Sequence, residues 1–211
     1  MKKKLLLAMG SAAAIAAVSI GGTLALFTDS KSASADIVAG TLCLSSERND
    51  GDPVPGPMFY ITAKQGATPS GVDGTLPTGY WAPGDAHKRT LNVRNDEACS
   101  SMNAWVSSIQ ARLNEHFGDQ YEPLAEKLYV TVKSPKASEG FVVIAEGPLS
   151  DFLAGPVTAR YPDGSSVPIY LSSVRQMEFE VAFDIQAGNQ YQGKTLVVDF
   201  IVNAEQMPNN P

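Results

Sequence analysis

The clearest structural signal in the chain is the ten-residue run Gln176-Met177-Glu178-Phe179-Glu180-Val181-Ala182-Phe183-Asp184-Ile185. Bulky apolar residues occupy every second position, and the residues between them are polar or small. Side chains alternate between the two faces of a β-strand, so this pattern predicts an antiparallel strand with one face in a core and one in water. A second alternating run, at 195–204, is apolar on both faces, which predicts a central strand or a covered outer face. We expect the Gly- and Asn-containing segment 187–193 to join the two runs as a hairpin.

The remainder of the chain also favours strands over helices. Seven further segments are strand candidates: 36–45, 58–63, 88–94, 102–113, 127–133, 141–145 and 167–171. The turn Pro83-Gly84-Asp85 comes just before the candidate at 88–94. Helix is expected only as short turns within 114–126 and 149–153. Many short strands separated by turns predict an all-β fold, an antiparallel β-sandwich of the jelly-roll type with a few short helices and long loops. We place this domain at 36–206, with a Gly/Pro-rich excursion at 47–79 that includes the candidate edge strand 58–63, and a frayed tail at 207–211.

The N-terminus has the organisation of a secretory signal peptide. Three lysines at positions 2–4 precede the apolar stretch Leu5 to Ile20, and the small-residue exit Thr23-Leu24-Ala25 follows. We expect residues 1–25 to be removed by cleavage after Ala25, which leaves Leu26 as the new N-terminus and places the protein outside the cytoplasm. The alternative is an uncleaved membrane anchor, because 22 residues of helix span about 33 Å.

The net charge limits the classes of partner, and the cysteine content predicts a disulfide. The 211 residues carry a formal net charge of −6, and loss of the leader lysines makes the chain still more acidic. An acidic protein repels nucleic acid, so we expect no nucleic-acid partner. The two cysteines, Cys43 and Cys99, are expected to form a disulfide in an exported chain. The alternative is a pair of buried free thiols on adjacent strands.

No catalytic constellation is recognisable in the sequence. His87 and His116 do not have the one-turn spacing of a zinc-hydrolase motif, and the chain contains no Gly-x-Ser-x-Gly elbow or phosphate-binding glycine loop. Asn49-Asp50-Gly51-Asp52 lacks the spaced ligands of a calcium loop. We therefore predict no catalytic, cofactor-binding or metal-binding residues and do not expect an enzyme.

Several motifs, taken in their order along the chain, resemble one protein family. They are Gly21-Gly22-Thr23-Leu24-Ala25-Leu26-Phe27-Thr28-Asp29, Ala39-Gly40-Thr41-Leu42-Cys43-Leu44, Pro83-Gly84-Asp85 with Leu91-Asn92-Val93-Arg94-Asn95, Gln176-Met177-Glu178-Phe179, and Asn189-Gln190-Tyr191-Gln192-Gly193. Together they are similar to the TasA/camelysin family of exported proteins of Gram-positive bacteria, whose best-known members build biofilm matrix fibres. The resemblance implies a jelly roll, maturation by a dedicated signal peptidase with cleavage after Ala25, and a homopolymer formed by donation of the N-terminal segment. The long 47–79 excursion and the cysteine pair depart from the family pattern.

Residues 26–35, which we call the N-terminal arm, are the candidate donor strand, and Leu26, Phe27, Thr28 and Asp29 lead it. Ten extended residues reach about 33 Å, enough to follow a strand of a neighbouring sheet. The alternative is that the arm folds onto its own domain. We thus expect a secreted fibre subunit of the extracellular matrix or cell surface. Two other functions stay open, a camelysin-like metallopeptidase, or an accessory or cell-wall anchoring protein of such fibres.

Overall fold

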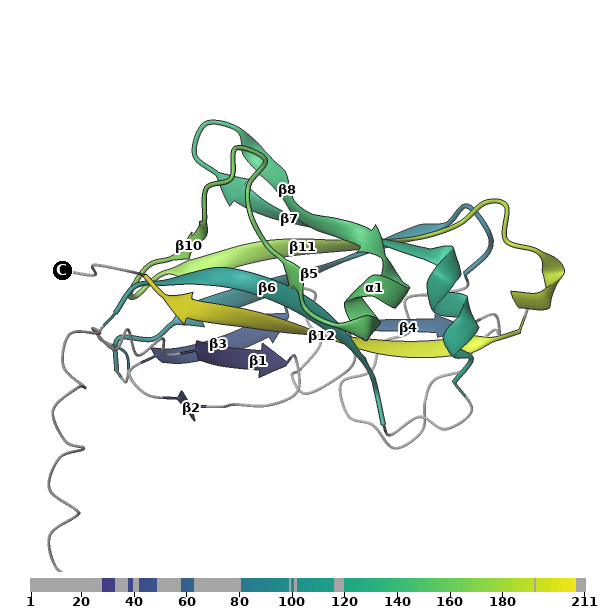
Figure 1. The fold of residues 1–211 in the computed structure, drawn as a ribbon, viewed down its shortest axis with the longest axis horizontal. Helices are drawn as coiled ribbons and strands as arrows, with labels where there is room; N and C mark the ends of the chain where they lie inside the picture. The colour runs from purple at the N-terminus through teal and green to yellow at the C-terminus, as the bar shows by residue number, and fades with distance from the viewer. Residues whose placement is uncertain are drawn as a thin grey trace, which may run out of the picture.

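Two antiparallel β-sheets face each other in this computed structural model (Figure 1). It describes residues 28–32, 38–39, 42–48, 58–62, 81–98, 100, 102–115, 120–191 and 193–207. The first sheet has the order β1 (Thr28–Ser32), β12 (Thr195–Gln206), β6 (Ala104–Leu113) and β10 (Val167–Ile169), with β4 (Phe59–Thr62) also paired to β12 and β9 (Val157–Thr158) to β6. The second sheet has the order β2 (Val38–Ala39), β3 (Leu42–Arg48), β5 (Ala86–Asn95), β11 (Val174–Phe183), β7 (Leu128–Lys136) and β8 (Gly140–Pro148). The all-β prediction is confirmed as a two-sheet sandwich, while the jelly-roll connectivity stays a prediction.

The core lies between the sheets and centres on Phe200 of β12. Its ring centroid lies 4.9 Å from that of Phe179 on β11 and 6.1 Å from that of Phe59 on β4. Phe152 of the short helix α1 (Leu149–Ala154) closes the same cluster at 6.1 Å. All four rings are fully buried. The alternation read from the sequence thus places one face of β11 and one face of β12 against each other.

The outer face of β12 is covered as well, as its two apolar faces predicted. Every residue from Leu196 to Phe200 is buried. Along the edge of β12, its backbone is also hydrogen-bonded to segment 120–121, just before the 3₁₀ helix η1 (Glu122–Lys127). The Val197 N–H donates to Oε1 of Gln120 at 2.9 Å, and the Tyr121 N–H donates to the Thr195 carbonyl at 2.9 Å.

The expected hairpin between the two C-terminal runs is wrong. Strand β11 pairs with β5 and β7 in the second sheet, whereas β12 pairs with β6, β1 and β4 in the first. Residues 184–194 cross from one sheet to the other and contain the 3₁₀ helix η2 (Asn189–Tyr191). The reason is that each run carries a full apolar face, and facing pairs such as Phe179 and Phe200 bury both faces at once.

The predicted strand 176–185 ends earlier than its alternation suggested. The Asp184 side chain accepts the Gln186 N–H at 2.8 Å, and the Ala187 N–H donates to the Asp184 carbonyl at 3.0 Å, so a turn begins at this residue. Ile185, expected on the inner face, is 76% exposed. It lies over the turn at Gly84, whose φ of +96° is a conformation that suits glycine.

The other predicted elements are found with small shifts of their bounds. The segment 36–45 splits into β2 and β3, and the candidate edge strand 58–63 is β4. The short β9 was not expected. Most of the 47–79 excursion and residues 208–211 of the tail lie outside the described residues, but the Met207 N–H donates to the Asn103 carbonyl at 3.0 Å. No helix in the described part is long and apolar enough to cross a membrane.

Candidate assembly edge

The described part of the N-terminal arm is a strand of its own chain's first sheet. Thr28 and Asp29 begin β1, which pairs with β12 from Thr28 opposite Glu205 to Ser32 opposite Ile201. This is the alternative in which the arm folds onto its own domain. The predicted cleavage residues Thr23, Leu24, Ala25 and Leu26, together with Phe27, lie outside the described residues.

Two short strands share one edge of β12 end to end. Strand β4 pairs with residues 195–198 of β12, and β1 pairs with residues 201–205. Both are antiparallel to β12, so they run in the same direction along its edge, and the end of β1 points toward the start of β4. Asp199 and Phe200 of β12 lie between the two paired segments. We call the 201–205 segment of this edge the arm site.

A buried carboxylate marks the junction. Asp199 is 1% exposed, and its Oδ2 accepts the Asn114 amide at 3.1 Å and lies 3.7 Å from Nη2 of Arg112. The backbone N–H of Met58, the residue before β4, also donates to this carboxyl. Burial raises the pKa of Asp199, and Arg112, Asn114 and Met58 oppose that shift without cancelling it.

Sequence reasoning missed Asp199 as a site residue. The available signal was one ionisable residue inside the apolar run of β12, Leu196-Val197-Val198-Asp199-Phe200. A buried charge of this kind needs partners, but nothing local in the sequence identifies them. Arg112 and Asn114 lie more than 80 positions earlier in the chain, and Met58 more than 140.

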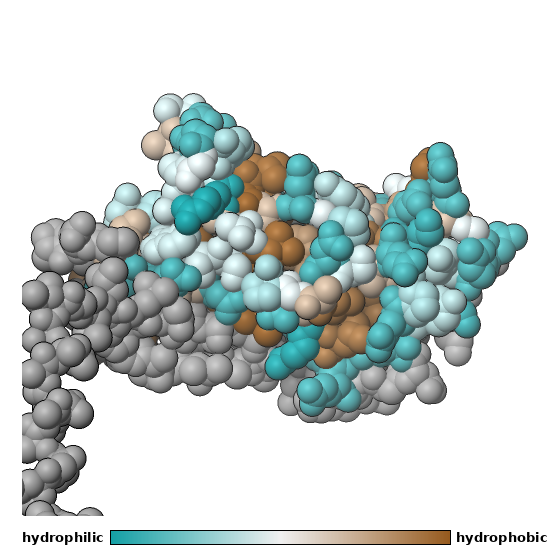
Figure 2. Space-filling model, viewed as in Figure 1, coloured by the Kyte–Doolittle hydropathy of each residue, from teal (hydrophilic) through white to brown (hydrophobic). Residues whose placement is uncertain are grey.

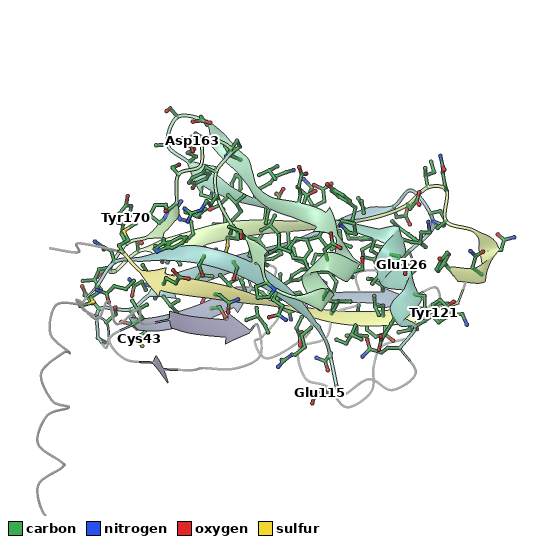
Figure 3. The ribbon with its side chains drawn as sticks, in the orientation of Figure 1. Cys43, Glu115, Tyr121, Glu126, Asp163 and Tyr170 are labelled. Atoms are coloured by element: carbon green, nitrogen blue, oxygen red, sulfur yellow. The ribbon has the colours of Figure 1, made fainter. Side chains whose placement is uncertain are left out.

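The cysteine prediction concerns the strand beside β1. Cys43 lies on β3 and is disulfide-bonded (Figure 3). The only other cysteine, Cys99, lies outside the described residues. The turn that leads toward it lies against β3, because the Asp96 N–H donates to the Cys43 carbonyl at 3.0 Å. One end of the disulfide is therefore a residue of β3, and its pairing with Cys99 stays a prediction.

The histidines and tryptophans that the structure describes do not come together in a catalytic or metal-binding cluster. The His87 ring packs on Trp81 with centroids 4.3 Å apart, and the guanidinium of Arg160 lies 4.6 Å from the Trp105 ring centroid. No three metal-ligating side chains come together among the residues described. His116 and the segment 49–52 lie outside that part.

Apolar side chains on the surface are scattered. Figure 2 shows brown residues in patches separated by teal, polar ones on the face viewed. Among the described residues, the large hydrophobic side chains that are exposed lie on β7, β8, β11 and two loops; they are Tyr129, Phe141, Tyr170, Val174 and Ile185. The candidate contact on this molecule is therefore a paired strand edge, the one that β1 and β4 share on β12, rather than a broad apolar surface.

Comparison with known proteins adds no relative. No family model matches the chain, and no curated protein matches it either. The resemblance to fibre-forming proteins therefore stays a prediction that rests on the motifs.

Proposed function

We propose that this protein is a secreted structural subunit that assembles into extracellular matrix fibres by exchanging β1 between copies. The observation that carries the proposal is the position of β1. It is a terminal, five-residue strand at the edge of the first sheet, and it is joined to β12 along the arm site. The same strand pairing forms whether β1 comes from its own chain or from another copy.

Exchange of β1 between copies costs little in contact energy. The pairing of β1 with β12 relies on backbone hydrogen bonds, which are the same in both arrangements, so exchange gains and loses the same contacts. An arm passed from each subunit to the next makes a head-to-tail contact that does not close on itself. Such contacts produce filaments. Removal of the leader after Ala25 would free the arm for this exchange.

The test compares three chains that begin at the expected mature N-terminus, Leu26. The unaltered chain should form filaments visible by electron microscopy. The double variant Asp29→Pro/Ser30→Pro loses two backbone donors and one of them must face β12, since neighbouring residues of a strand face opposite ways. We expect its critical concentration for assembly to rise about tenfold or more. The matched control Asp29→Ala/Ser30→Ala keeps both donors and should assemble.

A chain that lacks residues 26–35 completes the experiment. It should show the circular dichroism of a folded β protein and sediment as a monomer. Filaments from this chain would contradict the exchange of β1. An unaltered mature chain that stays monomeric at high concentration would contradict a self-assembling subunit and favour the accessory role.

A further inference from the structure

Strand β1 carries no apolar pattern that would fix its register on β12. Register is normally set by a hydrophobic pattern, because a one-residue slip exchanges the two faces of a strand. The sequence of β1 is Thr28-Asp29-Ser30-Lys31-Ser32, which contains no large apolar residue. A strand that is polar throughout has a weakly specified register and is free to slip.

A slip of β1 by two residues keeps each side chain on the same face of the sheet. It is therefore the slip that the residues of β1 themselves do not oppose. One such slip places Thr28 opposite Met207, beyond the end of β12 at Gln206, and a pair is lost. The opposite slip places Thr28 opposite Asn203 and Ser32 opposite Asp199. All five residues would then still face β12. Among the described residues, an obstacle opposite Asp199 would prevent this second register.

Met58 and Asp199 supply that obstacle. If the pairing of β4 is extended by one residue, Met58 falls opposite Asp199, and its N–H donates to the Asp199 carboxyl. Met58 is fully buried. Behind it, Phe59 packs edge-on against Trp81 and Phe200, at 6.5 Å and 6.1 Å between centroids, so the core holds β4 from Phe59 onward and Met58 is the residue that Asp199 holds.

We infer that Met58, held by Asp199 at the start of β4, is a stop that fixes the register of any strand at the arm site. Asp199 is in this sense a specificity-determining residue of strand exchange. The role in fibres rests on the proposed function, where the occupant is β1 of a second copy. The stop also acts in the single chain, where the occupant is the chain's own β1. This assigns a role to part of the 47–79 excursion.

Paired cysteines measure the register directly. Residues opposite each other on neighbouring strands are close enough for a disulfide. We place Ser30→Cys with Asn203→Cys to report the observed register, and with Ile201→Cys to report the slip by two. In the monomer we expect the first pair to cross-link about tenfold more than the second.

Changes at Asp199 then test the stop. Asp199→Ala removes the acceptor of the Met58 N–H, and the cross-link to position 201 should rise to within about threefold of that to position 203. Asp199→Asn keeps a carbonyl acceptor and should retain the preference of the unaltered chain. Equal yields of the two cross-links in the unaltered background, or an unchanged preference in Asp199→Ala, would overturn the stop.

A second variant keeps the test decisive if Asp199→Ala does not fold. Exchanging the two charged residues, as Asp29→Lys/Lys31→Asp, leaves the stop intact but reverses the charge pattern of β1. We expect the preference for position 203 to persist, and a shift to position 201 would overturn the inference. In filaments, Ser30→Cys and Asn203→Cys are placed on separate chains. Absence of linked dimers there contradicts the proposed function alone, because the monomer result stands independently.

Discussion

Asp199 is a carboxyl in a buried position, where burial disfavours its charged form. The carboxyl lies in the covered outer face of β12, and burial raises its pKa despite Arg112, Asn114 and Met58. Asp163 shows the opposite case at the surface. Hydrogen bonds from Lys136 at 2.9 Å and from Ser165 hold the pKa of Asp163 well below its usual range. The two carboxyls therefore contribute to stability with opposite dependence on pH.

We expect Asp199→Asn to raise the free energy of unfolding at pH 7 and to lose this advantage as the pH falls. Because the pKa of Asp199 is higher in the folded state than in the unfolded state, the folded chain binds more protons between the two values. The contribution of this group to stability therefore increases as the pH is lowered through the raised pKa toward the ordinary one. Asparagine resembles the protonated form at every pH. Urea unfolding of both chains at several pH values measures the difference.

Asp163→Asn is the matched contrast. A carboxyl with a lowered pKa contributes stability above its ordinary pKa, and that contribution is lost as the pH falls. This substitution should therefore give no gain at pH 7. An equal gain from both variants would show that removal of negative charge in general, rather than the burial of Asp199, is responsible.

Among the elements, β12 is the strand that belongs both to the core and to the candidate assembly edge. Its inner face carries Phe200 at the centre of four aromatic rings, and its edge holds both β4 and β1. Damage to the core through β12 should therefore be costly, while an exposed aromatic residue elsewhere should be dispensable.

Phe200→Ala should reduce the free energy of unfolding by about 3–5 kcal/mol, because it removes the ring that contacts Phe59, Phe152 and Phe179 and leaves a cavity. The control is Phe141→Ala on β8, where the side chain is 46% exposed and the loss should stay below about 1 kcal/mol. Chemical denaturation of the two variants tests this order. Similar losses would place the core elsewhere than at β12.

The strands themselves were predictable because a period of two is a local property. The alternation of Met177, Phe179 and Val181 predicted β11, and the apolar outer face of β12 predicted its central position. The sheet that each strand joins was not local information. The connection 184–194 reads as a hairpin, and only the packing of Phe179 on Phe200 shows that it crosses the sandwich. The Asp199 cluster was hidden for the same reason, since Met58 and Arg112 meet Asp199 only in the fold.

For the whole molecule, the arm determines whether the backbone groups at the arm site of β12 pair with the same chain or with another copy. In the single chain, β1 pairs with residues 201–205 of β12 and so covers the arm site. Removing the arm exposes those N–H and C=O groups, and an exposed strand edge recruits a new strand. The arm should therefore act as a ligand for the domain that lacks it.

A synthetic peptide of residues 26–35 should bind the chain that begins at Asp36 in a ratio of one to one. Ligand binding stabilises the folded state by about 2.7 kcal/mol at a free concentration 100 times Kd, which corresponds to a rise in Tm of about 5 °C or more for a chain of this size. A peptide with proline at positions 29 and 30 should have no such effect, because it lacks the backbone donors. The same peptide added to the intact mature chain should slow filament growth by occupying the arm site of terminal subunits. A rise in Tm without slower growth would mean that the arm site accepts a strand but that fibres grow through a different surface.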